Sequence, residues 1–215
     1  MTDFDVAEAD RLLKTTKQVR KRLDLTRPVP RELLLECIEV AGHAPIGGNI
    51  QANRWIVVDD NELKARIAPY YQQVGRAYLE SEMAGVDDPT QIRVADSARY
   101  LVDHIAEVPA MVIPVRLGAP GPENFESASF HGSIAPAVWS FQLAARARGL
   151  GSAWTTFHLA HEREIGELLG VPETATQVAL LAVGFYAGAG FTPARRRPAS
   201  SITYFNHWRR KLGAD

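Results

Sequence analysis

The stretch Ala44-Pro-Ile-Gly-Gly-Asn-Ile-Gln51 separates an apolar, helix-like segment (32–42) from a strand-like segment (55–58). A packed protein ordinarily joins two such elements with a few turn residues. This connection instead carries a proline, two adjacent glycines and two side-chain amides. Glycine lets the backbone approach a ligand closely, and amides both donate and accept hydrogen bonds, which suits a flat polar heterocycle. Two interpretations stay open here, a surface turn built on the glycine pair and a ligand-binding loop.

The composition is that of an ordinary globular protein with one domain. Of 215 residues, 46% are hydrophobic and 23% are charged, which is enough for one well-filled core. The 24 Lys and Arg against 25 Asp and Glu argue against nucleic acid or an anionic membrane surface as the main partner. No apolar run reaches the roughly 20 residues that span a bilayer, and the acidic N-terminus is unlike a signal peptide. We expect a cytoplasmic protein without a membrane partner.

The single cysteine, Cys37, cannot form an internal disulfide. It lies among apolar residues of a predicted helix, where a small buried hydrophobe is a better interpretation than a reactive thiol.

Periodicity and turn residues predict alternating helices and strands. The predicted helices cover 6–19, 31–42, a segment opened by the capping box Asp59-x-x-Glu62, 91–105, 134–148 and 162–169. The helix over 134–148 is apolar enough to be buried all round, in a core or against a partner chain, and Gly149-Leu-Gly151 is expected to break it. The predicted strands cover 55–58, 109–115, 153–155 and 178–185, and the tail from Gly188 shows no helical period. The pattern indicates a mixed α/β protein and leaves the strand order open.

Several familiar kinds of site are absent or poorly matched. Gly149-Leu-Gly-Ser-Ala-Trp154 follows a helix and lacks the third glycine of a dinucleotide fingerprint, and no P-loop or Gly-x-Ser-x-Gly elbow occurs. His158-x-x-His161-Glu162 lacks an obvious third metal ligand, so a capping or surface role is favoured over a metal site. In Phe130-His131-Gly-Ser133, a helix N-terminus explains the serine better than a nucleophile does.

Three polar segments remain, and they are far apart in the chain. They are Thr15-Thr-Lys-Gln-Val-Arg-Lys-Arg22, the loop 44–51, and Pro193-Ala-Arg-Arg-Arg-Pro198. A ligand with a phosphate at one end and a polar heterocycle at the other would use all three.

Taken together and in order, these segments resemble the nitroreductase family of FMN-dependent oxidoreductases. Thr16-Lys-Gln-Val-Arg20, followed by Pro28-Val, is similar to the family's Arg-Arg-Ser-Val-Arg pattern. The loop is similar to Ala-Pro-Ser-x-x-Asn-x-Gln, and Gly149-Leu-Gly-Ser-Ala-Trp-Thr-Thr156 to the segment under the flavin ring. Leu168-Leu-Gly-Val-Pro172, Val183-Gly-Phe185 and the Arg-Arg-Pro198 end complete a resemblance that runs over nearly the whole chain.

The resemblance implies an α+β fold with a mainly antiparallel central sheet flanked by helices, in an intertwined homodimer. Residues 1–215 would form a single FMN-binding domain, and 188–215 would be a C-terminal extension packing on the partner subunit. Each FMN site would be built from both chains.

The resemblance also implies roles for individual residues. Arg20 would lie near the pyrimidine end of the flavin, Lys17 and Gln18 near the ribityl-phosphate, and Arg195 and Arg196 on the phosphate. Thr16 stands where the family's first arginine stands. The remaining implied FMN contacts are Pro45, Ile46, Gly47 and Asn49 from the other subunit, and Trp154, Thr155 and Thr156 behind the ring.

The chain departs from the family pattern at four of these positions. Thr16 replaces an arginine, and Gln18 and Ile46 replace serines. Thr156, whose backbone N–H would be aimed at flavin N5, stands where one branch of the family has an acidic residue.

The implied function is transfer of electrons from NAD(P)H through FMN to a nitroaromatic, a quinone or a similar electron-poor acceptor. The flavin carries the chemistry, so the resemblance implies neither a catalytic side chain nor a metal. We expect the pocket walls to include 68–78 and the region near His131. A protein that stores or senses FMN without turnover is the alternative, and a flavin-free metal or structural protein is a third.

Overall fold

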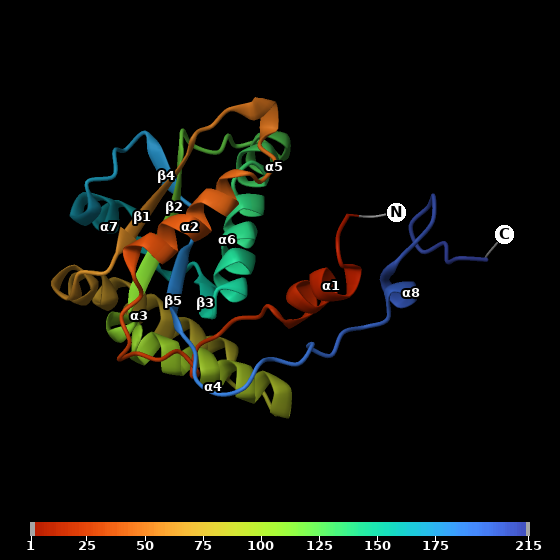
Figure 1. The fold of residues 1–215 in the computed structure, drawn as a ribbon, viewed down its shortest axis with the longest axis horizontal. Coiled ribbons are helices and arrows are strands. Elements are labelled where there is room, and N and C mark those ends of the chain that lie inside the picture. Colours follow the sequence, from red (N-terminus) through yellow and green to blue (C-terminus); the bar gives the residue numbers. More distant parts are fainter. Residues whose placement is uncertain (1–2, 214–215) are drawn as a thin grey trace. The chain divides into compact units, whose positions relative to one another are not determined.

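The computed structural model describes residues 3–213, which form two compact units (Figure 1). The main unit is Thr16–Ala189. The terminal unit comprises the described residues before Thr16 and after Ala189.

A five-stranded sheet runs through the main unit. Its strands are β1 (Asn53–Val58), β2 (Ala110–Leu117), β3 (Leu150–Thr155), β4 (Ala175–Gln177) and β5 (Leu180–Phe185). The order is β1-β2-β5-β3, with β4 pairing to β2, and each of these pairings is antiparallel. The antiparallel sheet implied by the resemblance is therefore confirmed. The three residues of β4 are too few to show an alternating pattern, so that strand was not predicted.

The strand β3 begins three residues earlier than predicted, at Leu150. Gly151 was interpreted as a break, but it lies inside the strand. A Cβ at Gly151 would meet the Cβ of Val19 at 2.9 Å, so the glycine allows close approach of the N-terminal segment.

The helices α2 (Arg31–Gly42) and α6 (Ala135–Ala147) pack together over one face of the sheet (Figure 1). Leu34, Val138 and Phe141 are fully buried in this layer. Cys37 is also fully buried there, as predicted, and burial raises the pKa of its thiol to about 11. Trp139 of α6 is partly exposed in the single chain, so the core of this chain does not bury the helix all round. Burial of that face against a partner chain stays a prediction.

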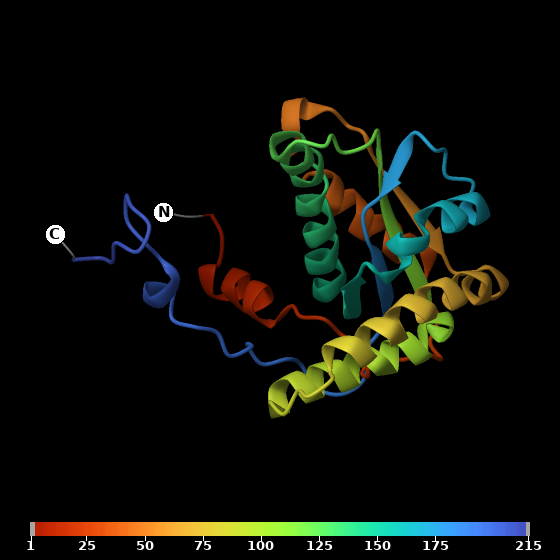
Figure 2. The same ribbon diagram turned by 180° about the vertical axis from the view of Figure 1, so that it is seen from behind.

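A second group of helices lies on the other side of the sheet. The hairpin of α3 (Asn61–Glu82) and α4 (Pro89–Asp103) lies at the bottom of Figure 2, and η2 (Ile105–Glu107) packs against α3. The segment η3 (Phe157–His161) also packs on α3 and leads into α7 (Glu162–Leu169), which ends at the left-handed Gly170 as predicted. Because side chains alternate along a strand, Trp154 joins the α2–α6 core and Thr155 points to α3.

Three local predictions need correction. The first helix, α1 (Val6–Thr15), ends before residue 16, because 16–20 run extended beside β3. Asp60, not Asp59, is the N-cap of α3, since its carboxylate accepts a 2.8 Å bond from the Leu63 N–H. The helix α5 (Asn124–Gly132) was not predicted.

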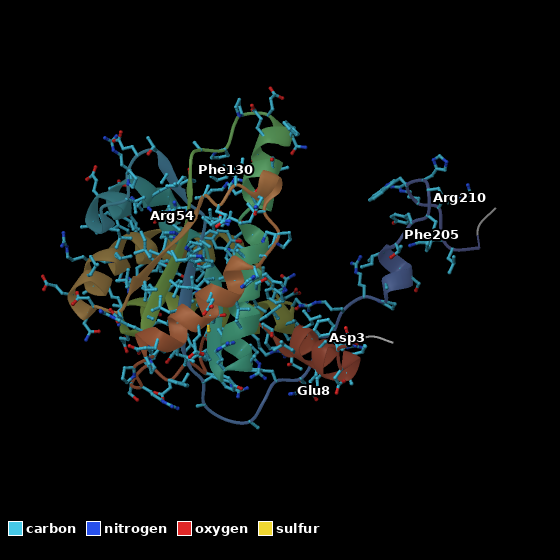
Figure 3. The ribbon with its side chains drawn as sticks, turned by 45° about the horizontal axis from the view of Figure 1, so that its top comes forward. Asp3, Glu8, Arg54, Phe130, Phe205 and Arg210 are labelled. Atoms are coloured by element: carbon cyan, nitrogen blue, oxygen red, sulfur yellow. The ribbon has the colours of Figure 1, made fainter. Side chains whose placement is uncertain are left out.

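The terminal unit contains α1 and a short helix, α8 (Ala199–Ile202), in a tail predicted to lack helix. Beyond α8 the backbone turns back on itself, and the Phe205 N–H donates to the carbonyl of Arg210 at 2.8 Å (Figure 3). Large apolar side chains of this unit stay exposed in the single chain: Phe4, Val6, Leu13, Ile202, Phe205, Trp208 and Leu212.

None of the helices formed by residues 3–213 is long and apolar enough to cross a membrane.

Candidate functional site

The first polar segment and β3 lie side by side, although more than a hundred residues separate them in the chain. Gln18 forms an isolated parallel bridge with Ser152, and the Val19 N–H donates to the Ser152 carbonyl at 2.9 Å. The side-chain oxygen of Gln18 accepts the Trp154 N–H at 2.5 Å. The fold thereby unites two of the segments predicted to hold the cofactor. It also shows a use for Gln18 that the sequence did not indicate, because this side chain anchors the backbone of β3.

A cavity of about 470 Å³ opens beside these segments. Its volume lies within the usual range for small-molecule sites, roughly 300–1,000 Å³. Four of the predicted residues line it, together with side chains of α3, α4 and η3. The lining residues are Arg20, Tyr71, Val74, Tyr78, Ala98, Leu101, Trp154, Thr155, Thr156, Phe157 and Ala160.

Arg20 is the one charged residue in that lining. Burial lowers the pKa of its guanidinium, and the electrostatic contact that opposes this shift comes from Tyr71. None of the ion pairs among residues 3–213 includes Arg20. A half-buried cation without a carboxylate favours a ligand that is anionic or rich in hydrogen-bond acceptors.

Aromatic side chains form another part of the cavity lining. The ring of Phe157 lies 5.4 Å from the ring of Tyr71 and 5.4 Å from that of Tyr78, measured between centroids. The Tyr71 hydroxyl lies 3.0 Å from the Thr155 hydroxyl, and burial raises the pKa of Tyr71 to about 12. Tyr71 therefore stays neutral and fixes Thr155. A cavity lined by aromatic rings and one cation suits an aromatic ligand with a polar edge.

The walls expected from the sequence coincide in part with the lining of this cavity. The range 68–78 supplies Tyr71, Val74 and Tyr78, whereas His131 does not line the cavity. Ala98 and Leu101 of α4 were missed, and small apolar residues on a helix carry no sequence signal that separates a pocket wall from a core.

The loop 44–51 does not line this cavity. Its residues Gly47–Asn49 form one turn, η1, in which Gly48 and Asn49 have positive φ of 60° and 54°. The Gly47 N–H donates to the Ser133 hydroxyl at 3.3 Å. Ser133 was predicted to open a helix, and that is wrong: it follows the last residue of α5, and its hydroxyl donates to the Ser129 carbonyl at 2.8 Å.

The other predicted residues lie outside the cavity lining. Thr16 is buried and Lys17 is half-buried next to Gln18. Pro45, Gly47 and Asn49 are exposed and Ile46 is half-buried. Arg195 and Arg196 are exposed and belong to the terminal unit.

A second cavity, of about 540 Å³, lies beside α7 and holds none of the predicted residues. Glu162, Glu164 and Glu167 are among its lining. Although it is larger, it lacks both an aromatic wall and an uncompensated cation, so the cavity at Arg20 is the better candidate.

The motif His158-x-x-His161-Glu162 does not gather into a metal site. His158 is fully buried, while the ring of His161 lies 3.4 Å from the carboxylate of Glu164. Within the described part of the chain, no group of three His, Cys, Asp or Glu side chains is placed to hold a metal ion.

Comparisons with known proteins agree on one family. The model of the nitroreductase family matches residues 14–185. Solved structures with this fold include an iodotyrosine deiodinase bound to FMN and 3-iodo-L-tyrosine, 23% identical with a TM-score of 0.68 over 92% of this chain and 98% of that chain. A BluB-like flavoprotein from Clostridium difficile 630 is 21% identical, with a TM-score of 0.69 over 93% and 99% of the two chains. A nitroreductase with bound FMN from Desulfitobacterium hafniense DCB-2 is 21% identical, with a TM-score of 0.66 over 96% and 100%.

The structural likenesses show the fold, and the family match extends over most of the sequence, including the 16–20 segment, the loop and β3. This chain belongs to the nitroreductase family.

Proposed function

We propose that the protein is an FMN-dependent oxidoreductase that passes electrons from NAD(P)H to an electron-poor acceptor such as a nitroaromatic or a quinone. The observation that carries the proposal is a cavity whose lining combines Arg20, which has no carboxylate partner among residues 3–213, with the aromatic side chains of Tyr71, Tyr78 and Phe157. Two structures with this fold, the deiodinase and the Desulfitobacterium nitroreductase, hold FMN.

The residues present fit FMN. Arg20 offers charge and hydrogen bonds to a polar ring edge, Trp154 and Thr155 supply a wall, and Thr156 is an exposed lining residue whose backbone N–H is available to a ring atom. Bound FMN would supply the hydride-accepting and electron-donating chemistry. The protein orients the ligand through the anchored strand β3, and its aromatic wall excludes water from the reacting face.

The complete site is proposed to need two copies of the chain. The loop residues Pro45, Ile46, Gly47 and Asn49 do not line the cavity, and within one chain the Gly47 N–H donates to the Ser133 hydroxyl. The terminal unit also exposes several large apolar side chains that a partner chain would cover. We therefore propose a homodimer in which the loop of one protomer and the cavity of its partner share the FMN, and in which 188–215 pack on the partner.

The experiment that tests the function begins with the visible spectrum of the purified protein and its titration with FMN. We expect a yellow protein with one FMN per chain, and steady oxidation of NADH or NADPH in the presence of nitrobenzene derivatives or benzoquinone. FMN binding without acceptor-dependent turnover would favour the storage or sensor role. A colourless protein that does not bind added FMN would contradict the proposal.

The C-terminal arginines give a prediction about affinity. Arg196→Ala is expected to weaken FMN binding about tenfold, because one charge-assisted bond to the phosphate is lost. Fluorescence titration with FMN and with riboflavin measures it, since riboflavin lacks the phosphate and should bind the variant and the wild type equally. Arg209→Ala, also in the tail, is the matched control. Equal FMN affinity of Arg196→Ala and wild type would remove Arg196 from the site.

A further inference from the structure

A line of polar contacts connects the ends of β1 and β2 to the loop 44–51. Asn53 of β1 and Arg116 of β2 face each other in the antiparallel register. A guanidinium nitrogen of Arg116 donates to the side-chain oxygen of Asn53 at 3.0 Å, and the Asn53 amide nitrogen donates to the Ser133 carbonyl at 3.0 Å. The Ser133 hydroxyl then accepts the Gly47 N–H at 3.3 Å.

Arg116 is an unusual residue for this place. It is only 8% exposed, and none of the ion pairs among the described residues includes it. Its guanidinium lies 5.4 Å from the centre of the Phe130 ring of α5, a residue labelled in Figure 3. A buried cation that has neither a carboxylate nor full hydration is costly, so its presence calls for a specific use.

The geometry shows that Arg116 orients the side-chain amide of Asn53. Arginine has donors and no acceptors, so Arg116 requires the oxygen of Asn53 to face it. The amide nitrogen of Asn53 must then face the Ser133 carbonyl. This hydrogen bond fixes the α5–α6 junction against β1. It thereby also fixes the Ser133 hydroxyl, which accepts the Gly47 N–H.

The loop is fitted closely to that junction. A Cβ at Gly47 would meet the Ser133 hydroxyl oxygen at 2.9 Å, and no other atom within 4 Å would obstruct it. Glycine at 47 therefore allows the close approach that brings its N–H to Ser133. The next two residues take the left-handed conformation that presents Asn49 at the exposed end of the turn.

We propose that Arg116, Asn53 and Ser133 are positioning residues that hold the loop 44–51 in its FMN-binding conformation. The inference rests on the proposed function, because the role of the loop in FMN binding belongs to that proposal. None of the three residues needs to touch the cofactor. They set the position of Gly47, and Gly47 sets the path of the turn that carries Asn49.

The sharpest variant is Asn53→Asp. Aspartate keeps the acceptor for Arg116 and adds an opposite charge, but it has no donor for the Ser133 carbonyl. We expect thermal unfolding of the FMN-free variant to match wild type or rise, while FMN binds about tenfold more weakly because the turn is released. Thr26→Val is the matched control, since it removes a 2.7 Å side-chain bond to the Asp24 carboxylate, and neither of these residues belongs to the network.

A second pair of variants tests the fit at Gly47. Gly47→Ala alone should weaken FMN binding more than Ser133→Ala does, because the added methyl collides with the hydroxyl. In the double variant the collision disappears, so its affinity should equal that of Ser133→Ala alone. Additive losses would show that the two residues act independently and would overturn the proposal.

The closing experiment measures amide hydrogen exchange of 46–50 in FMN-free wild type, Asn53→Asp and Thr26→Val, alongside FMN titration. Faster exchange confined to this loop in Asn53→Asp, together with weaker FMN binding, is the expected result. Unchanged exchange overturns the network, and faster exchange with unchanged FMN affinity overturns its role in binding. Failure of the wild type itself to bind FMN would contradict the proposed function, while the exchange measurement still reports on the network.

Discussion

Lowering the pH from 7 to 4 is expected to reduce the free energy of unfolding by about 3 kcal/mol through His158 alone. His158 lies in η3, directly after the cavity wall, and is fully buried. Within the described chain, neither ring nitrogen has a hydrogen-bond partner. Burial therefore lowers the pKa of the imidazole from its usual value near 6.5 to about 4.

The sign follows from proton binding. Between about pH 6.5 and pH 4 the unfolded chain protonates this histidine and the folded chain does not, so protons stabilise the unfolded state. The stability is fully present above pH 6.5 and is lost as the pH falls towards 4. Each pKa unit of difference corresponds to about 1.4 kcal/mol, which gives the stated magnitude.

Urea unfolding between pH 7.5 and pH 4.5 measures the effect. On acidification, His158→Leu and His158→Asn should lose less of their free energy of unfolding than wild type does. Each protein is compared with its own stability at neutral pH. The exposed His43→Asn serves as the control and should follow wild type. If a His158 variant does not fold, an NMR titration of the wild-type imidazole provides the same information, and a pKa near 6.5 would refute the prediction.

Arg20→Ala is expected to weaken binding of reduced FMN by about 3 kcal/mol and of oxidised FMN by about 1.5 kcal/mol, the limits for a hydrogen bond to a charged group. The difference arises because the polar ring edge becomes more negative on reduction, so the half-buried guanidinium favours the reduced form. The midpoint potential should then fall by about 30 mV for a two-electron couple.

Potentiometric titration of the bound flavin, together with FMN fluorescence titration, measures both effects. Arg20→Lys keeps the charge and should restore most of the potential but not all of the affinity, because lysine lacks the planar fork. Arg76→Ala on the surface of α3 is the control, since Arg76 does not line the cavity. An unchanged potential in Arg20→Ala would place the guanidinium away from the flavin ring.

The secondary structure that could be predicted is the part with strong local signals. The helix Glu162–Leu169 ends at Gly170 as the sequence indicates, because a left-handed C-terminal glycine is a local requirement. The end of α1 at Thr15 was not predicted, since 16–20 leave the helix to pair with β3, a contact across the chain. Gly151 likewise looked like a break because its close neighbour, Val19, is remote in sequence.

The candidate site divides in the same way. Charge and motif identified Arg20 and the Trp154–Thr156 segment from the sequence, and the cavity unites them. Tyr71 lies in the range 68–78 that was expected to form a pocket wall, whereas Phe157 looks like an ordinary core residue in the sequence. Only the packing of α3 against η3 brings the Phe157 ring beside Tyr71. The sequence did not indicate a role for Arg116 or Asn53, because their contact depends on the strand register.

By itself, the sequence predicted the family, which the family match confirms, and it indicated the class of ligand that we propose. Glycines, amides and arginines at given positions express what a cofactor requires, and that requirement is local chemistry. Only the tertiary structure decided which residues face one another. It brought the Gln18 side chain to the Trp154 backbone and placed Arg20, which has no carboxylate partner among residues 3–213, in one cavity with aromatic side chains. It also brought the Gly47 N–H to the Ser133 hydroxyl. The physical reason is that register and packing join groups far apart in the chain, and burial then gives each contact its energy.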